Sequence, residues 1–229
     1  RCCSSAASDV YKRQVDEGVC SIEDVDRGAK VGLRWARGPF ELMNRVGVLK
    51  SFEMAQDYLK LCQDESGKSN WQIPEFFANQ ASKNQKWDFS YVDTEISNGI
   101  ATITINRPEA MNALNETVIH QLGNAVDAVN SNDEVHTMVL DGAGKAFIAG
   151  ADVKFFVDKI RSDSIPDIVE FTSNGHKVLN SIENSPKTTI ALTTGLALGG
   201  GLELALCCDY RIGTRRTQFR FPETSIGIY

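Results

Sequence analysis

Two glutamates near the C-terminal end of the sequence, Glu203 and Glu223, could together move protons. Glu203 follows three consecutive glycines at positions 199–201, and Glu223 follows Pro222 after a short aromatic stretch. Two carboxylates can act as general acid and general base when their surroundings separate their pKa values. The pair therefore indicates proton-transfer chemistry, provided that the fold brings both side chains to one pocket.

Each glutamate also has an ordinary structural explanation. In the first turn of a helix, a carboxylate such as Glu203 complements the helix dipole, and Glu223 could be an exposed loop residue. The residues around Glu203 are apolar and predict a buried helix: Leu202, Leu204, Ala205 and Leu206. Because a buried carboxylate needs a partner or a task, this environment favours a functional role for Glu203.

The glycine run at 199–201 lies where a predicted strand gives way to a helix. Glycine allows φ > 0 and lets a ligand approach the backbone. The first amides of the following helix have no partner within it, so they form a site for negative charge. Tight packing of the helix on the strand is the structural alternative. The run is not a nucleotide motif, because it contains neither GxGxxG nor the lysine of a P-loop.

A second run of small residues, Ala149, Gly150 and Ala151, also precedes a predicted helix. Its amides could supply another donor to a developing oxyanion. Asp152 fits the N-cap of that helix. Lys154 could face a phosphate group, although an exposed lysine is the ordinary alternative.

The elements that must position these segments alternate between strand and helix over residues 87–229. Alternating and β-branched patterns predict strands at 89–94, 100–105, 137–141, 188–193 and 219–221, with a hairpin turn at 97–99. Apolar periodicity predicts helices at 116–129, 165–182 and 202–208. This order predicts an α/β domain with ligand sites at its strand-to-helix turns.

The preceding residues, 15–66, are predicted to form a small all-α domain with helices at 24–33, 40–46 and 49–63. Ser21 and Asp24 form a plausible N-cap pair, and Pro39 can begin the second helix. Residues 67–86 are polar and are interpreted as a linker. Because this segment carries Trp71, Phe76 and Phe77, we expect it to pack on something.

Residues 4–14 resemble the translation of a transposase adapter used to prepare sequencing libraries. We therefore interpret residues 1–14 as an artefact and exclude them from the fold prediction. At the other end, the sequence stops directly after an apolar run. We interpret the chain as a piece of a longer gene, open at both ends.

Composition and charge exclude several classes of function. The net charge is −6 without a basic stripe, so no nucleic-acid partner is expected. No apolar run reaches the roughly 18 residues of a membrane helix, and no signal peptide is evident, so no membrane partner is expected. The six cysteines lack the spacing of a metal site. We expect reduced thiols in a cytoplasmic protein that holds no metal.

The sequence from residue 87 onward resembles the crotonase superfamily, and within it the enoyl-CoA hydratases. Four stretches in the expected order carry the resemblance: 106–108 with 112–114, then 146–152, 197–209 and 221–223. It implies a crotonase-type spiral of ββα turns, truncated at its C-terminus here and preceded by the all-α domain. It also implies assembly as a homotrimer or a dimer of trimers.

Residue by residue, the resemblance implies a site for an acyl thioester of coenzyme A. The backbone amides of Ala151 and Gly200 would form an oxyanion hole, while Glu203 and Glu223 would activate water and deliver a proton. The acyl-CoA would contact Ala151, Asp152, Val153, Lys154, Gly199 and Gly200. The implied reaction adds water across the double bond of a trans-2-enoyl-CoA to give a 3-hydroxyacyl-CoA, with no cofactor besides this substrate.

Residues 15–66 resemble the C-terminal domain of 3-hydroxyacyl-CoA dehydrogenases, on stretches 18–26 and 38–42 and on Gly32. This order resembles fused bifunctional β-oxidation proteins of archaea and some bacteria. The NAD-binding part and the dehydrogenase histidine have no counterpart in the sequence, so no dehydrogenase activity is expected. Three alternatives to the hydratase stay open: an enoyl-CoA isomerase, a thioester hydrolase of the same superfamily, and an inactive acyl-CoA-binding fragment. Both glutamates together favour the hydratase, because shifting a double bond needs only one base.

Overall fold

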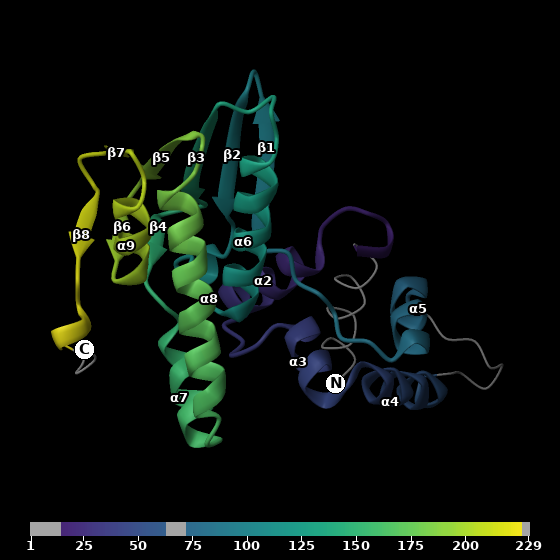
Figure 1. Ribbon diagram of the computed structural model, residues 1–229. Helices are drawn as coiled ribbons and strands as arrows, with labels where there is room; N and C mark the ends of the chain where they lie inside the picture. The colour runs from purple at the N-terminus through teal and green to yellow at the C-terminus, as the bar shows by residue number, and fades with distance from the viewer. Residues whose placement is uncertain (1–14, 63–71, 226–229) are drawn as a thin grey trace. The chain divides into compact units, whose positions relative to one another are not determined.

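The computed structural model describes residues 15–62 and 72–225 (Figure 1). Contacts divide the chain into two compact units, Arg1–Phe89 and Ser90–Tyr229. This division falls three residues after the predicted boundary between 86 and 87. The sequence features at 1–14, 67–71 and 226–229 lie outside the described residues. No described helix is long and apolar enough to cross a lipid bilayer.

The first unit contains short helices that share one apolar core. They are α2 (Ile22–Gly32), α3 (Pro39–Val46), α4 (Val48–Leu61) and α5 (Glu75–Lys83). The core is formed by Val25, Phe40, Met43, Val48, Phe77, Ala81 and Trp87. The Trp87 ring lies across that of Phe40, with centroids 5.1 Å apart and an interplanar angle of 79°. The helices predicted at 24–33, 40–46 and 49–63 are therefore present with small shifts at their ends, except that residue 63 lies outside the described part of the chain.

The beginning of α2 has the capping box that Ser21 and Asp24 predict. The Asp24 amide donates to Oγ of Ser21 at 3.1 Å, and the Ser21 amide donates to Oδ2 of Asp24 at 3.4 Å. Pro39 begins α3, also as expected, because its ring presets a helical φ and its missing N–H leaves nothing unpaired.

The segment interpreted as a linker contains a helix, α5. Phe77 is wholly buried in it, and its ring meets Phe52 of α4 edge-on at 5.4 Å. The aromatic residues therefore draw residues 75–83 into the first unit, despite their polar neighbours. Polar composition alone concealed the helix, because only one of its faces is buried.

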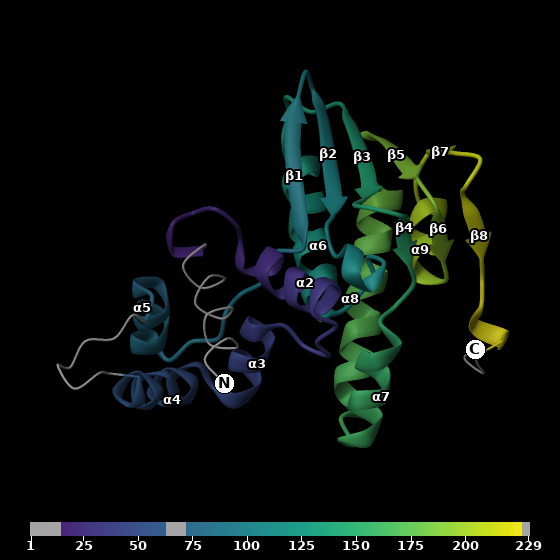
Figure 2. The same cartoon turned by 180° about the vertical axis from the view of Figure 1, so that it is seen from behind.

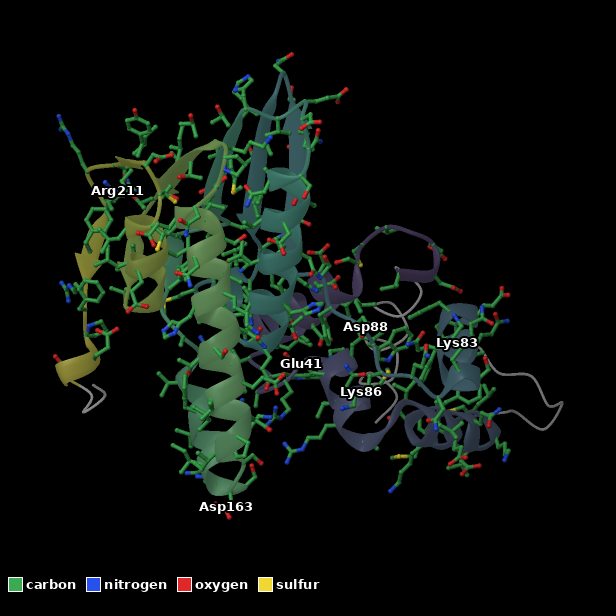
Figure 3. The ribbon with its side chains drawn as sticks, viewed as in Figure 1. Glu41, Lys83, Lys86, Asp88, Asp163 and Arg211 are labelled. Atoms are coloured by element: carbon green, nitrogen blue, oxygen red, sulfur yellow. The ribbon has the colours of Figure 1, made fainter. Side chains whose placement is uncertain are left out.

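A buried carboxylate joins α2 to α3. Asp26 is 2% exposed and accepts hydrogen bonds from the amides of Phe40 at 2.8 Å and Glu41 at 2.9 Å. These amides belong to the first turn of α3, so Asp26 caps that helix from a neighbouring one. Glu41, labelled on α3 in Figure 3, also pairs with Lys30 of α2. Gly38 is required beside this cap, because a Cβ there would overlap the Asp26 side chain.

The second unit is built on a five-stranded sheet in the order β1-β2-β3-β5-β7. Its strands are β1 (Val92–Ser97), β2 (Ile100–Ile105), β3 (Thr137–Gly142), β5 (Thr188–Thr193) and β7 (Tyr210–Gly213). β1 and β2 form an antiparallel hairpin, whose turn places Asn98 and Gly99 at φ values of 51° and 75°. All other pairings in this sheet are parallel. The predicted strands 100–105 and 188–193 are confirmed.

A smaller, fully parallel sheet runs beside it in the order β4-β6-β8. Its strands are β4 (Ala146–Ala149), β6 (Leu196–Leu198) and β8 (Gln218–Arg220). A strand of the large sheet thus precedes a strand of the small sheet three times along the chain, and helices follow the first two pairs. This succession is the ββα repeat that the sequence analysis predicts. β4 and β6 were missed because each is too short to give a pattern.

Helices cover one face of the large sheet, and the short helix after β6 packs against β4 and β6 of the small one (Figures 1 and 2). α6 (Glu116–Asn130) packs on β1 and β2 and lies beside α8 (Ile165–Glu183). α7 (Val153–Arg161) joins α8 through the rings of Phe155 and Phe171, 4.9 Å apart. Asp163, labelled in Figure 3, turns the chain between them at φ 54°. The short helix α9 (Gly200–Leu206) follows β6.

Asp26 should make the stability of the first unit depend on pH. Burial raises the pKa of Asp26 from 3.8 to about 6. Because the folded state then holds a proton more tightly than the unfolded chain, this stabilisation is complete below pH 4 and is lost as the pH rises through 6. We expect the free energy of unfolding of the wild type minus that of Asp26→Asn to fall by on the order of 3 kcal/mol between pH 4 and 7.

Tryptophan fluorescence during urea unfolding measures this difference, because Trp35, Trp71 and Trp87 all precede Ser90. A difference that stays constant from pH 4 to 7 would contradict the titration of Asp26 in this range.

Candidate active site

The loop between β6 and α9 contains three glycines with different surroundings. Gly199 has φ 47° and ψ −124°, a conformation that only glycine adopts without strain. A Cβ on Gly199 would overlap Oε1 of Glu223, and a Cβ on Gly201 would overlap the carbonyl oxygen of Ile148 in β4. Close approach of a carboxylate therefore requires Gly199, while tight packing of helix on strand requires Gly201.

The two predicted glutamates meet at this loop. Oε1 of Glu223 lies against Gly199, and Oε2 of Glu203 lies 3.8 Å from where a Cβ of the adjacent Gly200 would stand. Oε2 of Glu223 is buried and has no hydrogen-bond partner among the residues that the structure describes. Such an atom costs free energy unless something else binds it, so the loop presents a carboxylate oxygen that can accept a hydrogen bond from water or a ligand.

The expected burial of Glu203 is wrong. α9 buries Gly201, Leu202, Leu204 and Ala205, whereas Glu203 is exposed and Leu206 is 54% exposed. Positions 203 and 206 lie on the same helical face, three residues apart, so the apolar neighbours of Glu203 point to the opposite side. Glu203 thus faces open space beside the glycine loop rather than the core.

The predicted oxyanion segment is held by a short parallel bridge between Ala151 and Leu114. The Leu114 amide donates to the carbonyl of Gly150 at 2.8 Å, and the Asp152 amide donates to the carbonyl of Leu114 at 2.8 Å. Since Leu114 bonds to both neighbours of Ala151, the amide of Ala151 itself points to the opposite side. In the described part of the chain, neither this amide nor that of Gly200 makes a hydrogen bond.

The two glycine-containing segments lie next to each other. A Cβ on Gly150 would stand 3.3 Å from the carbonyl oxygen of Leu198, and one on Gly199 would stand 4.0 Å from Cα of Gly150. The Leu114 side chain touches the second segment as well, since its Cδ1 is 3.5 Å from the Cβ position of Gly200. The fold therefore brings Ala151 and Gly200 to the loop at which Glu203 and Glu223 meet.

Asn112 fixes the segment that carries Leu114. Its side chain is wholly buried, and its Nδ2 donates to the carbonyls of Ala143 at 2.9 Å, Ala146 at 2.9 Å and Phe147 at 3.1 Å. Its Oδ1 accepts from the amide of Arg107 at 2.9 Å. Asn112 also has φ 58°, which asparagine tolerates better than most residues.

Arg107 reaches the other side of the same segment. Its Nη2 pairs with Oδ2 of Asp152 at 2.9 Å, and its Nη1 donates to the carbonyl of Ala113 at 3.0 Å. Asp152 is also the predicted N-cap of α7, accepting from the amide of Lys154 at 3.1 Å. Val153 and Lys154 are exposed on the first turn of α7. Of the predicted substrate-binding residues, these two are the most accessible, and Asp152 is occupied by Arg107.

Sequence reasoning gave no role to Arg107, Asn112 or Leu114, although their stretches carried the resemblance. The signals were an asparagine, which tolerates a left-handed φ, and an arginine whose ionic partner lies far along the chain. Neither predicts the tertiary contacts that define these roles.

The far end of α9 is anchored by polar contacts. Nη1 of Arg211, labelled in Figure 3, donates to the carbonyl of Cys208 at 2.7 Å and to that of Ala205 at 3.2 Å. Oδ2 of Asp209 accepts from the Thr189 amide at 2.8 Å and hydroxyl at 3.0 Å, and these bonds lower its pKa. These contacts fix α9, and with it the glycine loop, to β5.

The cysteines next to the site are not activated nucleophiles. Burial raises the pKa of the Cys208 thiol to about 12 and also raises that of Cys207. Since the thiolate is the reactive form, both stay unreactive at neutral pH. Among the described residues, no group of three His, Cys, Asp or Glu side chains could hold a metal ion. What the site does contain is two carboxylates beside two backbone amides that make no hydrogen bond with a described residue.

Residues 100–229 match the family model described as enoyl-CoA hydratase/isomerase. The chain belongs to the enoyl-CoA hydratase/isomerase family. The match covers β2 and every later element of the second unit, including both glutamates and both glycine-containing segments.

Relatives in this family agree with the assignment. The chain is 43% identical over 130 residues to a crotonyl-CoA hydratase of Syntrophomonas wolfei, and 37% identical over 130 residues to a short-chain-enoyl-CoA hydratase of Clostridium acetobutylicum. Each alignment covers 56% of this chain and 48% of the relative. The chain thus spans about half the length of the relatives it matches.

Solved structures of the family share the fold. An enoyl-CoA hydratase/carnithine racemase from Magnetospirillum magneticum superposes with a TM-score of 0.57 at 33% identity, over 62% of this chain and 53% of that one. An enoyl-CoA hydratase/isomerase from Xanthobacter autotrophicus gives a TM-score of 0.55 at 32% identity, over 61% and 52%. The predicted crotonase-type fold is confirmed.

Two neighbouring glycines of the loop should respond differently to alanine. Gly201→Ala is expected to lower the free energy of unfolding of the second unit by about 2 kcal/mol or more, because its Cβ would overlap a strand carbonyl. Gly200→Ala is expected to change it by less than about 1 kcal/mol, since the nearest atoms are 3.5 and 3.8 Å away. Urea unfolding followed by far-ultraviolet circular dichroism measures both values. Equal losses would contradict a packing role confined to Gly201.

Proposed function

We propose that the second unit is the catalytic core of an enoyl-CoA hydratase, which adds water across the double bond of a trans-2-enoyl-CoA. The observation that carries the proposal is the meeting of Glu203 and Glu223 at one glycine loop, where Oε2 of Glu223 is buried without a described partner. The names of the relatives, crotonyl-CoA hydratase and short-chain-enoyl-CoA hydratase, favour a short acyl chain.

In this proposal the amides of Ala151 and Gly200 bind the thioester oxygen. They lie on adjoining segments and make no other described hydrogen bond, so both are available to an acceptor. When water attacks C3, negative charge moves to the thioester oxygen, and donors placed there beforehand stabilise that charge. Removal of one such donor costs roughly 3 kcal/mol in enzymes where this has been tested.

The two glutamates handle the protons of the attacking water. The oxygen of water bonds to C3 and a proton is added at C2. One water is therefore consumed for each 3-hydroxyacyl-CoA formed. One carboxylate alone could accept a proton, but positioning water and supplying the proton at C2 requires two groups on one side of the substrate. An isomerase needs only one, so the paired glutamates favour hydration.

The coenzyme A part would lie along Ala151 to Lys154 and beside Gly199 and Gly200. Lys154 is exposed at the beginning of α7, where its ammonium group could reach a phosphate. Asp152 contributes through its backbone and by holding Arg107, since its carboxylate is already paired. No cofactor besides the acyl-CoA substrate takes part in this proposal.

Other properties of the whole protein are proposals too. We propose a homotrimer or dimer of trimers, a cytoplasmic location that suits the reduced thiols of Cys62, Cys207 and Cys208, and fusion to a 3-hydroxyacyl-CoA dehydrogenase. The helices of residues 15–66 support the last proposal only by their resemblance to such a domain.

Both carboxylates should be essential. In the protein expressed from its complete reading frame, Glu203→Gln and Glu223→Gln are each expected to lower kcat by a factor on the order of 10² or more, because each removes a group that transfers protons. The assay follows loss of the conjugated enoyl-thioester absorbance of crotonyl-CoA. Glu95→Gln is the matched control, since Glu95 is exposed on β1, and it should keep wild-type activity.

A folded wild type that binds coenzyme A yet leaves crotonyl-CoA unchanged would refute the hydratase proposal. Conversion of a 3-enoyl-CoA by the same protein would then assign it as an isomerase, and release of free coenzyme A from acyl-CoA would assign it as a hydrolase.

Arg107 should act as a positioning residue for the Ala151 amide. Arg107→Met removes the ion pair with Asp152 and is expected to lower kcat about tenfold while changing the KM for crotonyl-CoA less than about twofold. A bound dienoyl-CoA should also show a smaller shift of its absorption to longer wavelength, because the displaced amide polarises the carbonyl less. Arg161→Met, at an exposed position of α7, is the control. An unchanged spectral shift would contradict the positioning role.

A further inference from the structure

Three turns of the second unit meet at one corner and enclose a basic hollow. They connect β3 to β4, β5 to β6, and β7 to β8, the last of which lies at the edge of the unit (Figure 2). The hollow has a volume of about 590 Å³ and is lined by Gly144, Lys145, Thr194, Gly195, Thr214, Arg215 and Arg216. Its lining thus contains three cations and two hydroxyl groups but no carboxylate.

The backbone that carries these cations is held in place by bonds between the turns. Gly195 has φ 93°, and a Cβ there would overlap the carbonyl oxygen of Lys145, so two turns are in direct contact. The Gly195 carbonyl accepts from the amide of Gln218 at 2.8 Å. The Thr217 hydroxyl accepts from the Thr214 amide at 2.8 Å and donates to the carbonyl of Thr193 at 2.6 Å. A corner fixed in this way loses little entropy when it binds a ligand.

The three cations have no acidic partner in the part of the chain that the structure describes. Within residues 15–62 and 72–225, none of Lys145, Arg215 and Arg216 takes part in an ion pair, in a chain whose net charge is −6. Like charges gathered around one hollow repel each other, and a multivalent anion between them removes that repulsion. Arginine forks and lysine ammonium groups match the oxygens of a phosphate group, and threonine hydroxyls can add further donors.

The corner is distinct from the candidate active site. The residues that line the hollow do not include Glu203, Glu223, Ala151 or Gly200. The strands of the small sheet separate the corner from the candidate active site. β4 begins beside Lys145 and ends before Gly150, and β6 begins after Gly195 and ends before Gly199. Strands of three and four residues correspond to a separation of roughly 10–13 Å.

We propose that this corner binds a diphosphate group, either free or carried by a nucleotide. The inference is independent of the hydratase proposal, since it uses none of the residues assigned to that reaction.

Isothermal titration of the full chain with inorganic pyrophosphate at low ionic strength tests the proposal. We expect saturable binding that weakens about tenfold or more in the double variant Arg215→Gln/Arg216→Gln, and also in Lys145→Gln, because each loses charge-assisted hydrogen bonds. The matched control is Arg45→Gln/Arg161→Gln, which removes the same two charges from exposed positions elsewhere and should bind as the wild type does. Lys154→Gln should likewise bind normally. Since all substituted side chains are exposed, thermal unfolding midpoints should be unchanged.

Comparing ADP with pyrophosphate in the titration shows whether the corner binds a nucleotide or the free anion. Tighter binding of ADP than of pyrophosphate, lost in the Arg215→Gln/Arg216→Gln variant, assigns the corner to a nucleotide, whereas equal binding assigns it to the free anion. Absence of saturable binding would overturn the proposal. So would an equal loss of affinity in the control double variant, or a loss in Lys154→Gln with retention in Arg215→Gln/Arg216→Gln.

Discussion

One buried side chain, the amide of Asn112, connects the segments on which the candidate active site is built. It joins one carbonyl just before β4 and two carbonyls within β4 to the backbone of Arg107, and its left-handed φ turns the chain toward Leu114. Leu114 then bonds to both neighbours of Ala151. Without the amide, these carbonyls would lose a hydrogen bond, and a buried group left unsatisfied costs about 1–3 kcal/mol. The position of the Ala151 amide is therefore set by a residue on a different segment from the loop of the glutamates.

Within the glycine loop, one glycine is needed for packing and another makes room for a glutamate of the candidate site. Gly201 lets α9 lie against β4, whereas Gly199 gives room to Glu223. Oε2 of Glu223 has no partner among the described residues, and a buried acceptor of this kind lowers stability unless a ligand or water binds it. Folds commonly accept such losses at functional positions and compensate for them elsewhere. Here the compensation includes the contacts of Arg211 and Asp209 at the other end of α9.

Local patterns predicted the long elements of the fold. β2 and β5 are rich in β-branched residues and alternate in burial, so their bounds follow from the sequence alone. β4 and β6 have four and three residues and give no pattern, although they carry the two donor segments toward each other. The exposure of Glu203 depends on which face of α9 meets β4, and apolar neighbours on a helix do not reveal that face.

The convergence of the site residues could be predicted only through the resemblance to a family. Spacing places Glu203 and Glu223 at the ends of elements, but the parallel pairings of β4, β6 and β8 decide that these ends meet. The ion pair of Arg107 with Asp152 joins residues 45 positions apart. Contacts of this kind depend on tertiary structure. A single sequence, read without a family, does not show which distant residues come together. The helix α5 was hidden for a related reason, because two aromatic residues outweigh a polar composition.

The order in which the second unit can assemble follows from its strand pairings. The hairpin of β1 and β2 closes over a two-residue turn, a local event that takes microseconds in isolated hairpins. The parallel pairs close much longer loops, which slows folding because chain entropy is lost before the contacts form. Leu114, Ala151, Gly200 and Glu223 come from four successive stretches of the chain, so the last crossover must be in place before they surround one point. A refolding chain would regain most of its secondary structure while the residues of the candidate site were still apart.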